Sequence, residues 1–219
     1  MGINERKEKE KEIRRKDIIE AAERIFFTKG YDNSTMDDVA KEAEFSKRTV
    51  YVYFNSKEQI YFEIMIKGYK LLINMLKNKL QKEKAINAIE EIRQMALILY
   101  GFSKDYPEYF KAIMEYENGE LDFQKGIPDK SREECYALGE EVLRYLIRAL
   151  ENGIAEGSFR NDLDVIKTAL ALWACMIGVF NIAKKKENYI RNYHNTTSEE
   201  LISEAFNLVI RSIQTGGIH

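Results

Sequence analysis

The chain has 219 residues, of which 45% are hydrophobic and 32% are charged, with only 12 glycines and 2 prolines. This length allows one large or two small domains with a buried core, and the scarcity of helix breakers favours long helices. The formal net charge of −2 excludes a histone-like basic protein. Any binding of nucleic acid must therefore depend on where individual charges lie.

The sequence predicts a cytoplasmic protein with no membrane segment. Cys135 and Cys175 both lie in helical stretches, so we expect reduced thiols. The first residues contain no apolar run of the kind found in a secretory signal. The most apolar stretch, Ala169 to Ala183, is shorter than the roughly 18 residues of a membrane helix and contains Asn181.

Residues 1–13 are a charged N-terminal arm, rich in lysine, arginine and glutamate. Pairs such as Glu10 and Arg14 have the i,i+4 spacing that would extend the following helix. Two alternatives stay open: a solvated, frayed end, and a basic arm that contacts a DNA backbone.

Three short helical segments follow the arm. Ile18, Ala22 and Phe26 share a helical face, and Gly30 is a typical helix stop. Thr35 precedes Asp38 with the spacing of a capping box, which predicts a second helix. Ser46 is the next candidate cap. The segment after it, Thr49 to Phe54, consists of β-branched and aromatic residues and by propensity alone favours a strand.

The rest of the chain has helical periodicity interrupted by polar or glycine-containing loops. Ser56 is a candidate cap for a long helix that starts with Lys57. Pro107 suits the first position of a helix, and Thr197 with Glu200 has capping-box spacing. Helices are predicted over 57–80, 86–104, 107–118, 129–156, 164–187 and 198–215, with loops at 118–129, 156–162 and 192–197.

The stretch "IIEAAERIFFTKGYDNSTMDDVAKEAEFSKRTVYVYFNSKEQI" resembles the DNA-binding domain of the TetR family of transcriptional regulators, over roughly residues 14–62. The matching features occur in order and at fixed spacing: Gly30-Tyr31, Thr35, Val39-Ala40, Ser46, Thr49-Val50-Tyr51, Tyr53-Phe54 and Ser56-Lys57-Glu58. One departure is Glu44, which stands where the family usually has glycine.

The resemblance implies an all-α fold with a three-helix helix-turn-helix domain at 14–60 and a larger helical ligand-binding and dimerisation domain at 61–219. The strand-like hexamer is then the second helix of the helix-turn-helix, with Val50 and Phe54 packed inward. The residues implied to bind double-stranded DNA are Thr35, Ser46, Lys47, Arg48, Thr49, Tyr51, Val52, Tyr53 and Lys57. Among them Thr35, Tyr51, Tyr53 and Lys57 are expected on phosphates, and Lys47, Arg48, Thr49 and Val52 near base edges.

The larger domain is expected to bind a small-molecule effector and to form a homodimer. Aromatic and methionine residues of its helices are candidates for an apolar pocket, although the same pattern is typical of an ordinary core: Tyr69, Met95, Tyr100, Phe110, Met114, Tyr136 and Trp173. By the same resemblance, the last two helices would form a four-helix bundle with a second copy. The residues predicted for this interface are Trp173, Ala174, Ile177, Gly178, Phe206, Val209 and Ile213, and an intrachain core is the alternative.

Enzyme chemistry has little support in the sequence. The only histidines are His194 and His219, so no histidine-dependent catalytic set or metal site can be assembled, and no cofactor is expected. The resemblance implies a ligand-responsive regulator, by preference a repressor that binds a palindromic operator as a dimer and is released by a small hydrophobic or aromatic ligand. The alternative is an all-α ligand carrier that keeps the fold without binding DNA.

Overall fold

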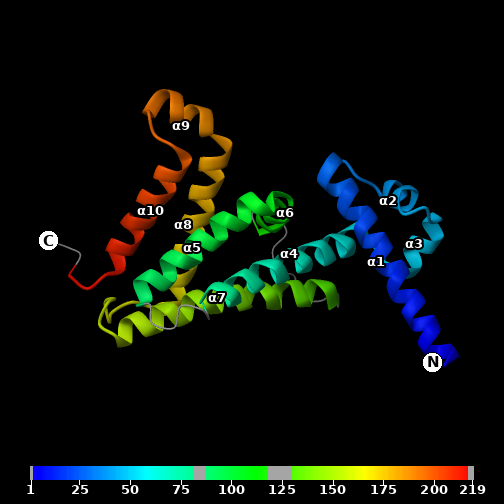
Figure 1. Cartoon of the computed structure of the whole chain (residues 1–219), viewed down its shortest axis with the longest axis horizontal. Helices are drawn as coiled ribbons and strands as arrows, with labels where there is room; N and C mark the ends of the chain where they lie inside the picture. Colours follow the sequence, from blue (N-terminus) through cyan, green and yellow to red (C-terminus); the bar gives the residue numbers. More distant parts are fainter. Residues whose placement is uncertain (1, 81–86, 118–129, 217–219) are drawn as a thin grey trace. The chain divides into compact units, whose positions relative to one another are not determined.

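A computed structural model of the chain describes residues 2–80, 87–117 and 130–216. Within these ranges the secondary structure consists of α-helices and one isolated bridge between Phe159 and Gln214. The prediction of an all-α fold is confirmed (Figure 1). The helices are α1 (Ile3–Lys29), α2 (Met36–Glu42), α3 (Lys47–Tyr53), α4 (Lys57–Leu80), α5 (Ala88–Asp105), α6 (Pro107–Glu117), α7 (Lys130–Ala155), α8 (Val165–Lys185), α9 (Glu187–His194) and α10 (Ser198–Ile213).

The chain divides into two compact units. The first unit comprises Met1–Lys70 and Glu108–Leu138, and the second comprises Leu71–Pro107 and Gly139–His219. The helix-turn-helix segment therefore forms a compact body together with α6 and the beginning of α7. The long helices α4 and α7 each contribute residues to both units.

In the first unit, α1 packs against α2 and α2 packs against α3. Ile18, Val39 and Val50 are fully buried between these helices. Polar contacts reinforce the packing, because Glu23 of α1 accepts hydrogen bonds from Lys67 of α4 and from the Tyr109 hydroxyl of α6. The helices that surround the helix-turn-helix thus hold it through both an apolar core and charged contacts.

The charged N-terminal arm is part of α1, which begins at Ile3. The Arg14 guanidinium donates to the Glu10 carboxylate at 2.5 Å, so the i,i+4 spacing that was noted in the sequence is used. Of the two open alternatives, a frayed arm does not describe this segment. A contact between the arm and DNA stays a prediction.

The second unit has a core of aliphatic side chains from α5, α7, α8 and α10, with Phe159 at one end. A Cβ atom added at Gly153 would lie 2.1 Å from the ring of Phe159, so the absence of a side chain there allows the ring to pack directly on α7. The amide of Phe159 donates to the carbonyl of Gly153 at 3.0 Å, which fixes the turn that follows α7. This core positions the cavity described below.

Two local differences from the sequence-based expectations are instructive. The strand-like hexamer is helical in α3, because burial of Val50 and Phe54 outweighs a weak local preference. The helix α9 lies where a loop was expected. Its sequence offers one buried apolar residue, Ile190, and it is supported by an ion pair between Glu187 and Arg191, so no apolar periodicity announced it. The predicted loop at 118–129 lies outside the described residues.

Candidate DNA-binding surface and ligand cavity

The turn between α2 and α3 ends α2 with a Schellman motif. The amide of Phe45 donates to the carbonyl of Ala40 at 2.9 Å, and the amide of Glu44 donates to the carbonyl of Lys41 at 3.2 Å. Glu44 has a φ of 57°, in the left-handed region that glycine adopts without strain. The glutamate therefore leaves the turn geometry intact but places a side chain where the backbone disfavours one.

The start of α3 is fixed by Ser46. Its hydroxyl accepts a hydrogen bond from the amide of Thr49 at 3.0 Å and lies 2.8 Å from the Thr49 hydroxyl. On the inner side of the helix, Val50 and Phe54 are 0% and 1% exposed. These two anchors determine which side of α3 faces outward, and the predicted inward role of both residues is confirmed.

The outer face of α3 combines a cation, a phenol and an apolar side chain. Tyr51 is 44% exposed and Val52 is 72% exposed. Arg48 is exposed and has no hydrogen bond or ion pair with any residue that the structure describes. Because guanidinium and phenol groups can donate to phosphates and base edges, this face has the chemistry of a major-groove reader.

The second cation of α3, Lys47, is already engaged. Its ammonium group lies 2.8 Å from the carboxylate of Asp37 in α2, and this contact raises the pKa of Lys47. Both side chains are more than half exposed. The carboxylate would therefore compete with a phosphate for the same ammonium group, a feature that sequence spacing alone could not reveal.

Thr35 caps α2 through the predicted capping box. Its hydroxyl accepts from the amide of Asp38 at 3.1 Å, and its own amide donates to the Asp38 carboxylate at 2.9 Å. The Lys29 ammonium group and then Thr35 hold the pKa of Asp38 down at about 2. Since the pKa is lowered, this carboxylate stabilises the fold above its ordinary pKa of about 4, and the stabilisation is lost as the pH falls towards 2.

Lys57 lies at the start of α4, and its ammonium group points into the loop between α1 and α2. It donates to the backbone carbonyl of Tyr31 at 2.7 Å and to that of Ser34 at 2.9 Å. It also lies 4.1 Å from the centre of the Tyr31 ring. Burial raises the pKa of Tyr31 to about 12, with smaller contributions from the charges of Glu58 and Asp32. Lys57 thus joins α4 to the helix-turn-helix, and a phosphate contact would have to be made in addition to these bonds.

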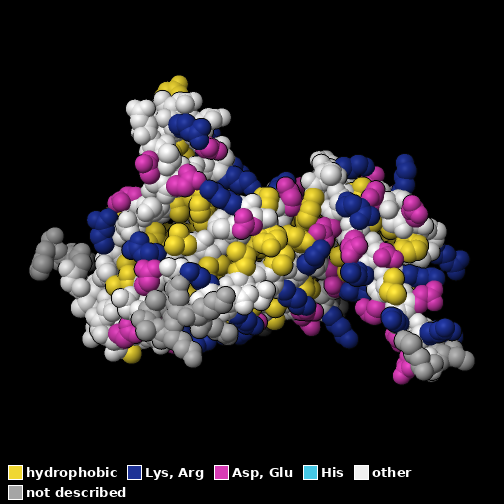
Figure 2. Space-filling model, in the orientation of Figure 1, with side chains coloured by type: hydrophobic (Ala, Val, Ile, Leu, Met, Phe, Trp, Pro, Cys, Tyr) yellow, Lys and Arg dark blue, Asp and Glu magenta, His cyan; other side chains and the backbone are white. Residues whose placement is uncertain are grey.

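The first unit has no uniform positive face. Figure 2 shows Lys and Arg side chains intermixed with Asp and Glu over α1, α2 and α3. Ion pairs join neighbouring helices here, as between Arg24 and Glu42 at 2.7 Å and between Lys29 and Asp38 at 2.6 Å. Contacts to DNA would therefore depend on a few placed groups rather than on a broad basic surface.

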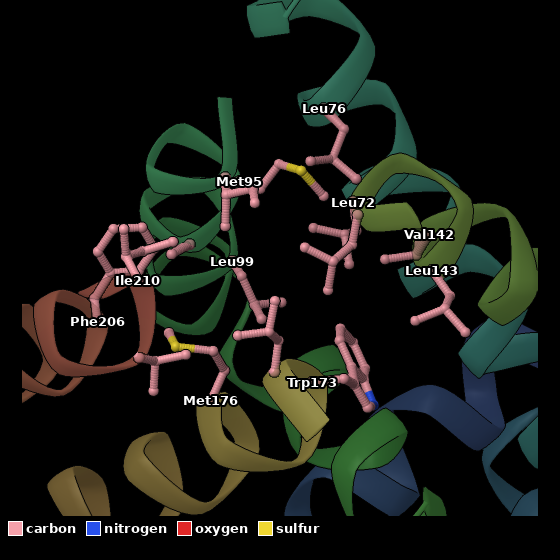
Figure 3. Close-up of a pocket in the computed structure, with 15 residues that line it drawn as sticks. Leu72, Leu76, Met95, Leu99, Val142, Leu143, Trp173, Met176, Phe206 and Ile210 are labelled. Carbon is pink, nitrogen blue, oxygen red and sulfur yellow. The ribbon is translucent and has the colours of Figure 1, made fainter. Parts of the chain in front are cut away.

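The second unit contains an apolar cavity of about 60 Å³. Figure 3 shows side chains from α4, α5, α7, α8 and α10 pointing towards a common space, with Leu99, Met176 and Trp173 among them. The walls are made of apolar residues: Leu72, Leu76, Ile92, Met95, Ala96, Leu99, Val142, Leu143, Leu146, Leu172, Trp173, Met176, Phe206, Val209 and Ile210. We call this space the apolar cavity.

Of the residues predicted for a pocket, Met95 and Trp173 line the apolar cavity. Tyr69, Phe110, Met114 and Tyr136 lie in the first unit, where the first three are buried. Tyr100 stacks on Phe180 and donates to Glu199 at 2.6 Å. The aromatic pattern therefore selected mainly core residues. The aliphatic wall was missed because leucine and isoleucine at helical spacing look the same in a core and in a pocket.

The residues predicted for a dimer interface have mixed positions. Ala174 and Gly178 are exposed on α8. Ile177, Phe206 and Ile213 are buried within the chain, and Trp173 and Val209 line the apolar cavity.

The exposed face of α8 is strongly apolar. Ile166, Leu170, Ala174, Gly178 and Ile182 recur every four residues, and the three large residues among them are about half exposed. By length and composition α8 would suffice to cross a membrane, with a mean hydropathy of 1.8, and 22% of that stretch is buried within the chain. An unpartnered apolar stripe of this kind is typical of a helix that packs against another protein surface.

Comparison with known proteins agrees with the geometry. Residues 18–64 match the family model described as bacterial regulatory proteins, tetR family. The chain is 25% identical over 158 residues to the HTH-type transcriptional repressor NicS of Pseudomonas putida, covering 72% of this chain and 71% of NicS.

Two solved structures share the fold. The regulator FadR of Bacillus subtilis in complex with stearoyl-CoA has a TM-score of 0.64 at 19% identity, covering 93% of this chain and 98% of that structure. AibR in complex with isovaleryl coenzyme A and operator DNA has a TM-score of 0.62 at 18% identity, covering 89% and 97%. The matched domain, the relatives and the common fold together show that the chain belongs to the TetR family of regulatory proteins.

Proposed function

We propose that the protein is a cytoplasmic, ligand-responsive transcriptional repressor that binds a palindromic operator as a homodimer. The observation that supports this most is the outward face of α3, where Arg48, Tyr51 and Val52 are exposed while Val50 and Phe54 hold the helix against its neighbours. In a dimer, two such helices would enter successive major grooves about 34–36 Å apart.

The second copy would cover the apolar stripe on α8. Ala174 and Gly178 at its middle would allow a partner helix to approach closely, and Ile166, Leu170 and Ile182 would supply apolar area on either side. Two helices from each chain, α8 and α10, would form a four-helix bundle around the two-fold axis.

The effector would be a small hydrophobic or aromatic molecule bound in the apolar cavity, and its binding would loosen the complex with DNA. A coupling of roughly 1–3 kcal/mol between the two sites would reduce DNA affinity by about 5–150-fold. FadR and AibR, which share the fold, were solved with acyl-CoA ligands.

The test of the contact assignment is DNA affinity measured with single variants. Tyr51→Phe and Arg48→Ala should weaken binding, whereas Thr49→Ala and Lys47→Ala should also change the preferred sequence. If Tyr51→Phe and Arg48→Ala both leave the affinity unchanged, α3 does not contact DNA through this face, and a ligand carrier without DNA binding becomes the better account.

A further inference from the structure

The walls of the apolar cavity come from five helices and offer almost no polar chemistry. The described lining residues have aliphatic, thioether or aromatic side chains, and none of them carries a charge. A charged group placed inside would lose its hydration and would find no opposite charge in the walls. Because such a transfer is very unfavourable, the cavity selects against ions.

The size of the cavity limits what enters without rearrangement. Each water-sized group needs roughly 10–15 Å³ of such space, so the volume of about 60 Å³ corresponds to about four to six non-hydrogen atoms. Two of the wall residues, Met95 and Met176, have flexible thioether side chains that can adjust to the shape of a guest. A larger guest would have to separate the helices that supply the walls.

We propose that the effector inserts an uncharged hydrocarbon group of about four to six carbon atoms into the apolar cavity. Any charged or strongly polar part of the molecule stays outside it. The inference deepens the proposed regulatory function, and its meaning for gene control rests on that function. The binding specificity itself depends only on the walls of the cavity.

The protein has a built-in reporter for this binding. Trp173 is the only tryptophan in the chain and lines the cavity, so its fluorescence reports directly on a guest. The full chain would be titrated with three probes that share one ring: cyclohexane, cyclohexylammonium and cyclohexanecarboxylate. We expect a saturable change with cyclohexane, and binding of each charged probe that is weaker by at least about tenfold.

Filling the cavity supplies the matched control. Ala96 lines the cavity, whereas Ala155 is exposed at the end of α7, so Ala96→Leu and Ala155→Leu add the same atoms in two different settings. Ala96→Leu should weaken cyclohexane binding by at least about tenfold, because the added carbons occupy the space of the guest, while Ala155→Leu should leave it unchanged. Thermal melts of both variants establish that they fold, and Ala96→Val replaces Ala96→Leu if the larger side chain prevents folding.

Two results would overturn the inference. One is a charged probe that binds as tightly as cyclohexane, and the other is cyclohexane binding that is insensitive to the filling of the cavity. These titrations contain no DNA, so their outcome is separate from that of the regulatory proposal. Selective operator binding without cyclohexane binding would refute this inference alone. Cyclohexane binding without any operator binding would refute the proposed function and leave the cavity specificity in place.

Discussion

The α3 surface and the apolar cavity differ in how they treat charge. At the α3 surface, Lys47 is paired with Asp37, and Arg48 is exposed without a partner. In the cavity the described walls have no charge at all. Binding at the first site must exchange existing ion pairs for new ones, whereas binding at the second must displace water and fill volume.

This difference gives each site its own sensitivity. Salt and charge substitutions should act on the α3 surface, because exposed ion pairs are screened by dissolved ions. Substitutions that change side-chain volume should act on the second unit, because a packed interior responds to single methyl groups. The four predictions that follow test this division, beginning with the largest expected effect.

Gly153→Ala should destabilise the second unit by about 3 kcal/mol, since its Cβ would lie 2.1 Å from the Phe159 ring. The control is Gly101→Ala in α5, where an added Cβ meets nothing within 4 Å. That variant should be stabilised by up to about 1 kcal/mol, through helix propensity alone. Thermal and urea unfolding of the two variants at equal protein concentration make the measurement. Equal stabilities would contradict the packing of Phe159 on α7.

Lys57→Met should destabilise the contact between α4 and the α1–α2 loop by about 2 kcal/mol, because two hydrogen bonds from a charged donor are lost. Amide hydrogen exchange in the loop that contains Tyr31 and Ser34 should become faster. Lys41→Met, an exposed lysine of α2, serves as the control and should change neither property. If exchange stays unchanged and only the salt dependence of DNA binding falls, Lys57 acts as a phosphate ligand and not as a structural bridge.

Glu44→Gly should stabilise the protein by about 1 kcal/mol, because it removes a side chain from a left-handed backbone position. The same change at Lys41, in the right-handed helix α2, should instead cost about 1 kcal/mol. The opposite signs of two neighbouring glycine substitutions are the signature to look for in thermal melts. Destabilisation by both would mean that the Glu44 side chain has a stabilising role of its own.

Asp37→Asn should strengthen DNA binding by about fivefold at most, because it frees the Lys47 ammonium group and removes a negative charge beside the DNA-facing helix. The gain should shrink as the salt concentration rises. Glu140, an exposed carboxylate of α7, provides the control as Glu140→Gln. A gain that is independent of salt would argue that Asp37 acts through the fold and not through charge.

The two regions also differ in how far they could be predicted from sequence. The helix-turn-helix was predictable because caps, a turn and buried anchors recur at fixed spacing, and Ser46, Thr35 and Val50 have the roles that this spacing indicates. The pairing of Lys47 with Asp37 was not, since the two residues meet only after α2 and α3 have packed. The cavity was harder still. Aliphatic residues at helical spacing form cores and pockets alike, so Leu99 and Met176 had no distinguishing mark.

The most direct test of the account is the affinity of the full-length dimer for the DNA upstream of its own gene, measured at several salt concentrations against a scrambled duplex of equal length. The account predicts tighter binding to the upstream DNA than to the scrambled duplex, with a logarithm of affinity that falls linearly with the logarithm of salt concentration. Binding that is equal for both duplexes, or that is absent at low salt, would contradict the assignment of the α3 surface to DNA.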